Sequence, residues 1–316
     1  MFLILFLVGA ILSEKSVFNK RADKNPLLKY YTAEDFNLNA QPVALRHGEL
    51  NGFLYTDPQV KQNGKLIVFC HGMGPGHIAY TTEIAYFCNH GFTVLAVDNR
   101  GCNLSMGNMK GMYSGVLSAM CAIEFASTDE SLKEKPLYLV GHSWGGYSAL
   151  CSSLNYKVDG VVAMGAPDTP AKTMSSGAAP LIGKFLATIL RPFWYIVNLF
   201  KFGFKGNSSA GKCASKNNTP TLLIQGECDN TVNLKCSAYK RAKGAHITKY
   251  LAKGKAHNPY NTTAAEQKLA ELTKNLMNAA KMTEEQKQDC FGNFDYAAAT
   301  EEDQQIMQTI VDFLNK

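Results

Sequence analysis

The chain has 316 residues, of which 46% are hydrophobic, and a formal net charge of +6. This length suits one large α/β domain and is short for two independent ones. The basic residues form no block interleaved with aromatic side chains, which argues against a nucleic-acid partner.

The nine cysteines are odd in number and irregularly spaced. Several of them, including Cys70, Cys121 and Cys151, stand within apolar strand or helix patterns. These features indicate buried thiols in a reducing compartment rather than a disulfide framework. No pair of cysteines and no Cys/His cluster has the spacing of zinc ligands, so the sequence predicts neither a metal site nor a cofactor.

The N-terminal segment Met1–Leu12 is wholly apolar. It lacks the basic start of a signal peptide and falls short of the roughly 20 residues of a transmembrane helix. Basic residues follow up to Lys24, and such charges tend to stay on the cytoplasmic side of a membrane. Residues 1–24 therefore form a separate segment with three interpretations: a membrane-associating anchor, a truncated signal sequence, or a helix packed on the domain. We expect a cytoplasmic protein in the first and third cases, and the second leaves a secreted or surface-anchored form open.

Strands and helices alternate in the first half of the chain. Residues 35–57 show short alternating patterns, which predicts an antiparallel hairpin leading into a sheet. Continuous apolar runs at 66–70 and 92–97 predict strands buried on both faces. Helical patterns at 81–90 and 113–125 separate these strands from the next ones. The alternation predicts an α/β fold with a parallel sheet and right-handed crossovers.

The stretch LYLVGHSWGGY, residues 137–147, contains G-x-S-x-G at the end of a strand and the start of a helix. Such a turn strains the backbone of its central residue, and the flanking Gly141 and Gly145 leave room for it. Ser143 is therefore the candidate nucleophile. A serine hydroxyl needs activation, so a histidine base and an acidic partner are expected further along the chain.

After a strand at 160–164, the alternation stops over residues 168–219. The pattern there predicts two helices separated by Pro192, which we interpret as a helical cap. Its apolar surface exceeds what docking requires, so part of it is expected to face the cleft and to contact an apolar acyl chain. The candidate residues for this contact are Phe185, Leu186, Ile189, Phe193 and Trp194. Basic residues beside aromatic ones in the cap also suggest contact with a membrane surface.

Two further strands are predicted at 221–225 and near 248–251. Asp229 follows the first of them and His257 follows the second. Because these positions lie past the carboxyl ends of parallel strands, both residues should share a rim of the sheet with Ser143.

Each of these two assignments has rivals. Glu227 and Asp168 compete with Asp229, which is favoured by its place just after a strand. His246 competes with His257 but precedes the last strand, on the opposite edge of the sheet. His142, next to the nucleophile, is expected to position a loop.

With these residues in view, the chain resembles the α/β-hydrolase superfamily, in particular the serine hydrolases that include monoglyceride lipases, lysophospholipases and acyl-ester hydrolases. The motifs HG, D-x-R-G, GHSWGG, G-x-x-D and a late histidine follow successive strands in the order of that family, between about residues 66 and 261. Asn103 stands where the family often has a second glycine after D-x-R-G. Asparagine tolerates positive φ better than other residues, so the loop should keep its shape.

The resemblance implies the α/β-hydrolase fold, a mostly parallel twisted sheet with helices on both faces. The core would comprise residues 25–167 and 220–316, with the cap at 168–219 inserted after the sixth strand. In this family the loop after one buried strand and the residue after the nucleophile supply backbone N–H groups to an oxyanion hole. Met73 and Trp144 occupy the matching positions.

Together, the motifs and the resemblance predict a serine hydrolase in which Ser143 attacks a carbonyl, His257 acts as the base and Asp229 orients the histidine. The expected substrate is a small-molecule or lipid-like ester with an apolar acyl group. A serine peptidase acting on short peptides is the first alternative. The second is a non-catalytic ligand-binding protein of this fold, which is disfavoured because all three members of the triad are present.

Overall fold

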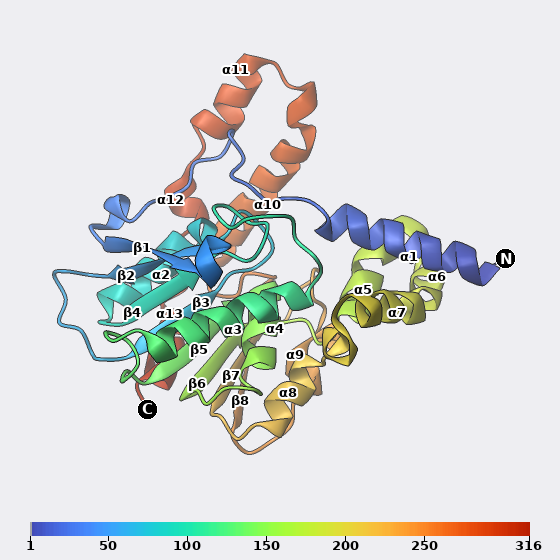
Figure 1. Cartoon of the computed structure of the whole chain (residues 1–316). Helices are drawn as coiled ribbons and strands as arrows, with labels where there is room; N and C mark the ends of the chain where they lie inside the picture. Colours follow the sequence, from blue (N-terminus) through green and yellow to red (C-terminus); the bar gives the residue numbers. More distant parts are fainter. Residues whose placement is uncertain (1) are drawn as a thin grey trace.

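The computed structural model describes residues 2–316 and is built around an eight-stranded sheet (Figure 1). The strands lie in the order β1-β2-β4-β3-β5-β6-β7-β8. Their bounds are β1 Asn39–Leu45, β2 Leu50–Thr56, β3 Leu66–Cys70, β4 Thr93–Val97, β5 Leu137–His142, β6 Gly160–Met164, β7 Thr221–Gly226 and β8 Ile247–Ala252. Strand β2 pairs antiparallel with β1 and β4, and the other pairings are parallel. The predicted hairpin and the mostly parallel sheet are confirmed.

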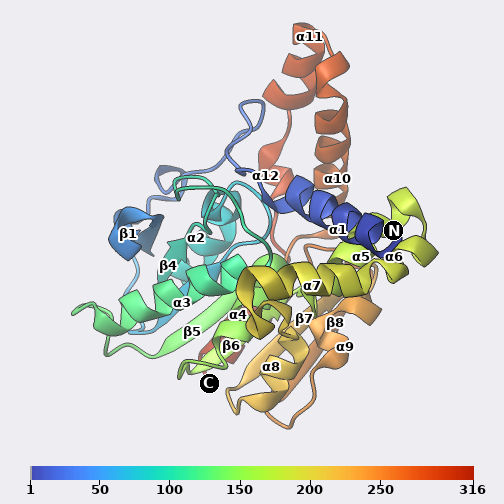
Figure 2. The ribbon, with the colours of Figure 1, turned by 45° about the vertical axis from the view of Figure 1, so that its right-hand side comes forward.

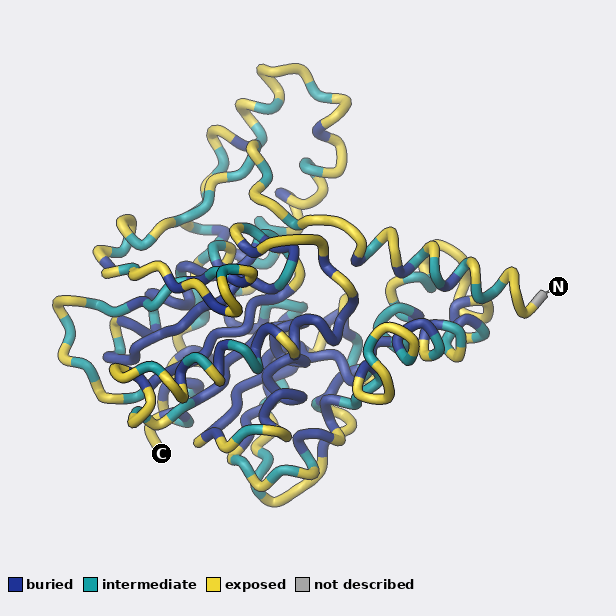
Figure 3. Tube along the Cα trace, viewed as in Figure 1, coloured by how far each residue is buried: buried dark blue, intermediate teal, exposed yellow. Residues whose placement is uncertain are grey.

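The middle of the sheet is covered on both faces, and the tube in Figure 3 shows it as a buried layer. Every residue of β3, β4, β6 and β7 is buried, as expected of continuous apolar strands. One face packs against α3 (Tyr113–Thr128) and α4 (Trp144–Ser152). The other face packs against α2 (Thr81–Asn89) and α13 (Gln304–Leu314). The helices predicted at 81–90 and 113–125 correspond to α2 and α3.

Four helices lie between β6 and β7, where the cap was predicted to be inserted after the sixth strand. They are α5 (Pro170–Ile182), α6 (Lys184–Ile189), α7 (Arg191–Phe202) and α8 (Ala210–Lys216). Gly183 interrupts the first two with a φ of 82°, a conformation that favours glycine. Pro192 lies in the first turn of α7, where a missing N–H costs no helical hydrogen bond. The limits of the cap at residues 168 and 219, and of the core at 25, stay a prediction.

The N-terminal segment is a helix, α1 (Phe2–Phe18), that packs against the cap; Figures 1 and 2 show it beside α7. Ala10 and Trp194 are both fully buried in the apolar cluster between the two helices. The indole N–H of Trp194 donates a hydrogen bond to the Ser13 hydroxyl at 3.0 Å. Lys201 forms an ion pair with the buried carboxylate of Glu14.

Among residues 2–316, no helix combines the length and the apolar character that crossing a bilayer would require. Association of α1 or the cap with a membrane surface stays a prediction.

A helical excursion follows β8 and projects away from the sheet in both ribbon views (Figures 1 and 2). It contains α10 (Thr263–Asn278), α11 (Glu284–Lys287) and α12 (Tyr296–Ala299). Helix α11 begins with a capping box in which Thr283 and Gln286 exchange hydrogen bonds, as its sequence indicates. The excursion reaches the functional site only at its base, where Leu269 and Thr300 line a cavity.

Candidate active site

Ser143 occupies a sharp turn between β5 and α4. Its φ and ψ are 53° and −118°, a strained conformation for a residue with a side chain. A hydrogen bond from its backbone N–H to the carbonyl of Met164 in β6, at 2.8 Å, holds the turn against the sheet. A Cβ atom on Gly145 would collide with the backbone carbonyl of Cys70, and one on Gly141 would collide with that of Gly145. Both glycines of the motif are therefore required by close backbone packing.

Three side chains from three strand ends form one hydrogen-bonded chain. Nε2 of His257 lies 2.9 Å from Oγ of Ser143. On the other side of the ring, Nδ1 of His257 lies 2.9 Å from Oδ2 of Asp229. The structure thus brings together the three residues that the sequence singled out. Glu227 and His246 lie elsewhere: the Glu227 carboxylate accepts from the Gly254 N–H, and His246 bonds to the carbonyl of Ala214.

The Asp229 carboxylate is fully buried and firmly held. Its Oδ1 accepts hydrogen bonds from the backbone N–H groups of Thr231 and Val232, at 2.9 and 2.8 Å. Its Oδ2 also accepts from the side-chain amide of Gln225, at 2.9 Å. With Oδ2 as acceptor, Nδ1 of His257 is the donor, so Nε2 is left to accept the proton of the Ser143 hydroxyl.

The rival acid Asp168 has a structural role. It is buried, accepts a hydrogen bond from the hydroxyl of Ser209 and pairs with Lys172. These contacts tie the start of the cap to the start of α8. Asp168 makes no hydrogen bond to His257 in the described part of the chain.

A second, buried network lies behind His257. Nε2 of His142 donates to the backbone carbonyl of His257 at 2.9 Å, and Nδ1 accepts from the hydroxyl of Tyr80 at 2.9 Å. The same hydroxyl accepts from the backbone N–H of Gly72 at 3.1 Å. Burial lowers the pKa of His142 to about 3, which keeps the ring neutral and able to accept at Nδ1.

The sequence pointed to His142 as a loop-positioning residue but gave no reason to single out Tyr80. Tyr80 belongs to no motif, and its spacing from Ser143 carries no information. The only available signal was its place near the loop that follows β3, which the family uses to bind an oxyanion.

The backbone N–H groups of Met73 and Trp144 are the candidate oxyanion donors. Trp144 is the first residue of α4, where helical N–H groups have no partner within the helix. Neither N–H donates a hydrogen bond to another group in residues 2–316. The loop that carries Met73 is fixed by His71, whose Nδ1 donates to the carbonyl of Gly72 at 2.6 Å and whose Nε2 accepts from the N–H of Asn99 at 2.9 Å.

The loop after β4 keeps its shape with an asparagine in place of glycine. Asn103 has a φ of 44°, in the left-handed region. Its side chain donates to Oδ2 of Asp98 at 2.9 Å. The expectation that asparagine supports this loop is confirmed.

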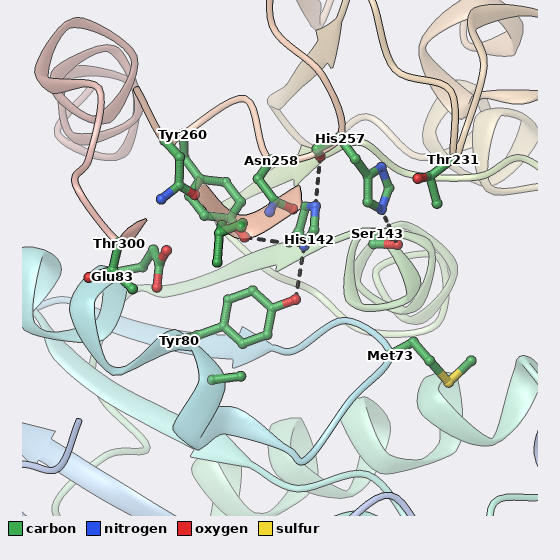
Figure 4. Close-up of a pocket in the computed structure, with 13 residues that line it drawn as sticks. Met73, Tyr80, Glu83, His142, Ser143, Thr231, His257, Asn258, Tyr260 and Thr300 are labelled. Atoms are coloured by element: carbon green, nitrogen blue, oxygen red, sulfur yellow. Dashed lines mark hydrogen bonds between the residues drawn. The ribbon is translucent and has the colours of Figure 1, made fainter. Parts of the chain in front are cut away.

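A cavity of about 370 Å³ opens in front of Ser143, and Figure 4 shows the side chains around it. Ser143 and His257 lie on one side of it, and Glu83 and Thr300 lie on the other. The wall between them is largely aromatic and aliphatic. The lining residues are Met73, Ala79, Tyr80, Glu83, His142, Ser143, Thr231, His257, Asn258, Tyr260, Asn261, Leu269 and Thr300.

The predicted cap contacts are not part of this cavity, which corrects the expectation that they face the cleft. None of Phe185, Leu186, Ile189, Phe193 and Trp194 lines it. Trp194 is fully buried, and the ring of Phe193 packs against Phe6 of α1 at a centroid distance of 5.6 Å. Phe185 is 82% exposed. For Phe193 and Trp194, the physical reason is that α1 covers the apolar surface that the sequence pattern left for a substrate.

Comparisons with known proteins agree with this architecture. The model of the alpha/beta hydrolase family matches residues 67–252. No curated protein sequence matches that of the chain.

Solved structures with the same fold include an esterase from Pyrococcus furiosus, with a TM-score of 0.58 and 18% identity over 82% of this chain and 98% of that one. A second crystal form of the esterase gives a TM-score of 0.57 at 17% identity, over 82% and 97% of the two chains. A putative lipase from Acinetobacter baumannii AYE has a TM-score of 0.51 and 13% identity over 72% of this chain and 87% of that one. At such identities, these structures are evidence of the fold alone. Because the family match extends over more than half of the sequence and includes the turn at Ser143, the chain belongs to the alpha/beta hydrolase family.

Proposed function

We propose that the protein is a serine hydrolase that cleaves carboxylic esters through an acyl-enzyme intermediate. The observation that carries the proposal is the hydrogen-bonded chain from Asp229 through His257 to Ser143, with both distances at 2.9 Å. This arrangement gives a hydroxyl nucleophile an adjacent base whose tautomer is fixed by a buried carboxylate.

In the first half of the reaction, Oγ of Ser143 attacks the acyl carbon while its proton passes to Nε2 of His257. The carboxylate of Asp229 stabilises the imidazolium that forms. The backbone N–H groups of Met73 and Trp144 bind the negative oxygen of the tetrahedral intermediate, each donor contributing about 3 kcal/mol. His257 then returns the proton to the leaving alcohol, and the acyl group stays on Ser143.

In the second half, His257 takes a proton from water, and the hydroxide attacks the acyl carbon. Collapse of the second tetrahedral intermediate releases the carboxylic acid and restores the Ser143 hydroxyl. The side chains of Met73 and Leu269 give the cavity an apolar wall. This wall supports an acyl group as the bound portion of the substrate, because burying apolar surface contributes about 25 cal/mol per Å².

The proposal is tested by labelling with a fluorophosphonate probe and by turnover of p-nitrophenyl acetate, butyrate and hexanoate. We expect Ser143→Ala to lose the label and to lower kcat by several orders of magnitude. Ser127→Ala, at an exposed position on α3, should keep both the probe labelling and the ester turnover of the unchanged protein. Labelling of Ser143→Ala at the level of the unchanged protein would place the nucleophile elsewhere. Faster turnover of short peptide amides than of any ester would favour a peptidase.

A further inference from the structure

A second cavity, of about 600 Å³, lies between the cap and the loop that follows β7. We refer to it as the basic cavity, because Lys172, Lys184, Arg191 and Lys235 line it. The remaining lining side chains are uncharged, and several carry hydroxyl or amide groups. No carboxylate of residues 2–316 lines it. No local sequence pattern indicates such a site, because these residues come from α5, α6, α7 and a loop about forty positions away.

Three of the four cations lack a charged partner. Lys172 pairs with Asp168 at 3.1 Å. Lys184, Arg191 and Lys235 have no carboxylate within 4.0 Å among residues 2–316. Cations gathered in a concave site repel one another, and the repulsion is relieved when an anion enters. The basic cavity is therefore suited to a negatively charged ligand.

The donors in the basic cavity match a phosphate group. The guanidinium group of Arg191 is partly held by a hydrogen bond from Nε to the hydroxyl of Ser175, at 2.9 Å. A guanidinium fixed in this way presents a planar set of N–H groups suited to bidentate bonds with phosphate oxygens. Asn230 and Asn233 add amide donors from the loop after β7. A phosphate has enough acceptor oxygens to satisfy several of these groups together.

The basic cavity is adjacent to the cavity in front of Ser143. Asn230 lines the basic cavity, and Thr231 lines the other. The loop after β7 therefore contributes to the lining of both cavities. Both residues directly follow Asp229, whose carboxylate is bonded to His257. A substrate that extended from Ser143 along this loop would place a charged group in the basic cavity.

We propose that the basic cavity binds a phosphate group carried by the ester substrate, so that the enzyme acts on acyl esters of phosphorylated alcohols. The proposal rests on the proposed function, because the ester is cleaved at Ser143. Two kinds of ligand would bring a phosphate group to this cavity: a phosphorylated ester and free inorganic phosphate. The experiment distinguishes between these two ligands.

The test compares kcat/KM for 1-butyrylglycerol 3-phosphate with that for the neutral 1-butyrylglycerol. We expect the unchanged protein to prefer the phosphorylated ester by about tenfold or more, as charge-assisted hydrogen bonds contribute strongly. Arg191→Gln and Lys235→Gln should each reduce this preference severalfold through KM, and should leave turnover of the neutral ester unchanged. Lys205→Gln is the matched control, because Lys205 is exposed in the same insertion and does not line the basic cavity. Lys205→Gln should leave kcat/KM unchanged for both esters.

A binding measurement supplies the second arm. Ser143→Ala should bind 1-butyrylglycerol 3-phosphate in calorimetry, and the double variant with Arg191→Gln should bind it more weakly. Binding of inorganic phosphate that depends on Arg191, without any preference for the phosphorylated ester, would overturn the proposal and leave a site for free anions. Equal losses of kcat/KM for the phosphorylated ester in Lys205→Gln and Arg191→Gln would also overturn the proposal, because the effect would then come from general surface charge. If neither ester is cleaved but Ser143→Ala binds the phosphorylated one through Arg191, the anion site stands and the proposed hydrolysis fails.

Discussion

The hydroxyl of Tyr80 lies 2.9 Å from Nδ1 of His142, and both side chains are buried. Through this bond, the loop that carries the candidate oxyanion donor Met73 is connected to the backbone carbonyl of His257. Two parts of the site that must keep a fixed separation are thus joined by one neutral hydrogen-bonded network. Neither residue touches the reacting atoms in the proposed mechanism, so both are positioning residues.

We predict that Tyr80→Phe lowers kcat about tenfold on p-nitrophenyl butyrate and leaves KM nearly unchanged, because small misplacement of reacting groups is costly. The variant leaves a buried N–H of Gly72 without a partner, so the free energy of unfolding should fall by about 1–3 kcal/mol. Steady-state kinetics and urea unfolding measure the two effects. Tyr86→Phe on α2 is the control, because its ring stacks on His90 without a role in the network. A rise in KM with unchanged kcat would contradict a positioning role.

The turn at Ser143 should tolerate no side chain at Gly145. The Cβ of Gly145→Ala would overlap backbone atoms of Cys70 and His71, which cannot rotate away. We expect a loss of several kcal/mol in the free energy of unfolding, or no folded protein. Gly177→Ala in α5 is the matched control, since nothing lies within 4 Å of its added Cβ. It should be stabilised by about 0.5–1 kcal/mol, and equal behaviour of the two variants in urea unfolding would refute the packing argument.

Glu83 and Glu302 make stability depend on pH. Burial raises the pKa of both carboxyl groups, and the charge of Glu83 raises that of Glu302 further. The folded state therefore holds protons that the unfolded state has released. The free energy of unfolding should fall as the pH rises above 4.5, the usual pKa of a glutamate side chain.

We expect Glu302→Gln to flatten this decline, because its amide remains neutral at every pH. Urea unfolding at pH values from about 5 to about 9 measures the slope. Glu301→Gln, at the exposed neighbouring position, should keep the slope of the unchanged protein. An unchanged slope in Glu302→Gln would show that this carboxyl group is not the source.

The contact between α1 and the cap should contribute to stability. Ala10→Asp would bury a charge beside Trp194 without a partner, which should cost about 3 kcal/mol or more. Val8→Asp is the control on the exposed side of α1, where Val8 is 45% exposed, and should change stability by no more than about 0.5 kcal/mol. Thermal unfolding compares the two variants. Similar midpoint temperatures of unfolding for the two variants would mean that α1 does not stabilise the cap.

The sequence was most informative where backbone geometry restricts the residue type. Glycines around Ser143 and continuous apolar runs in the central strands have few alternative explanations, so the sheet and the turn followed from them. The positions of Asp229 and His257 followed from the rule that functional residues gather at the carboxyl ends of parallel strands.

The sequence could not assign partners to apolar faces. The pattern in α7 shows an apolar stripe, but the stripe is the same whether a substrate or another helix covers it. Its partner, α1, comes about 180 positions earlier in the sequence. The Tyr80 network and the basic cavity were missed for a similar reason, because their members come from separate elements and form no local pattern.

The pairing of α1 with α7 also has a consequence for the time course of synthesis. Ser13 and Trp194, which share a hydrogen bond, are 181 positions apart in the sequence. At roughly 5–20 residues per second on the ribosome, about 10–35 seconds pass between the emergence of α1 and that of α7. During that interval, the apolar side of α1 is uncovered, and any other apolar surface it meets competes with α7. Helix α1 is thus synthesised well before the helix that buries its apolar side.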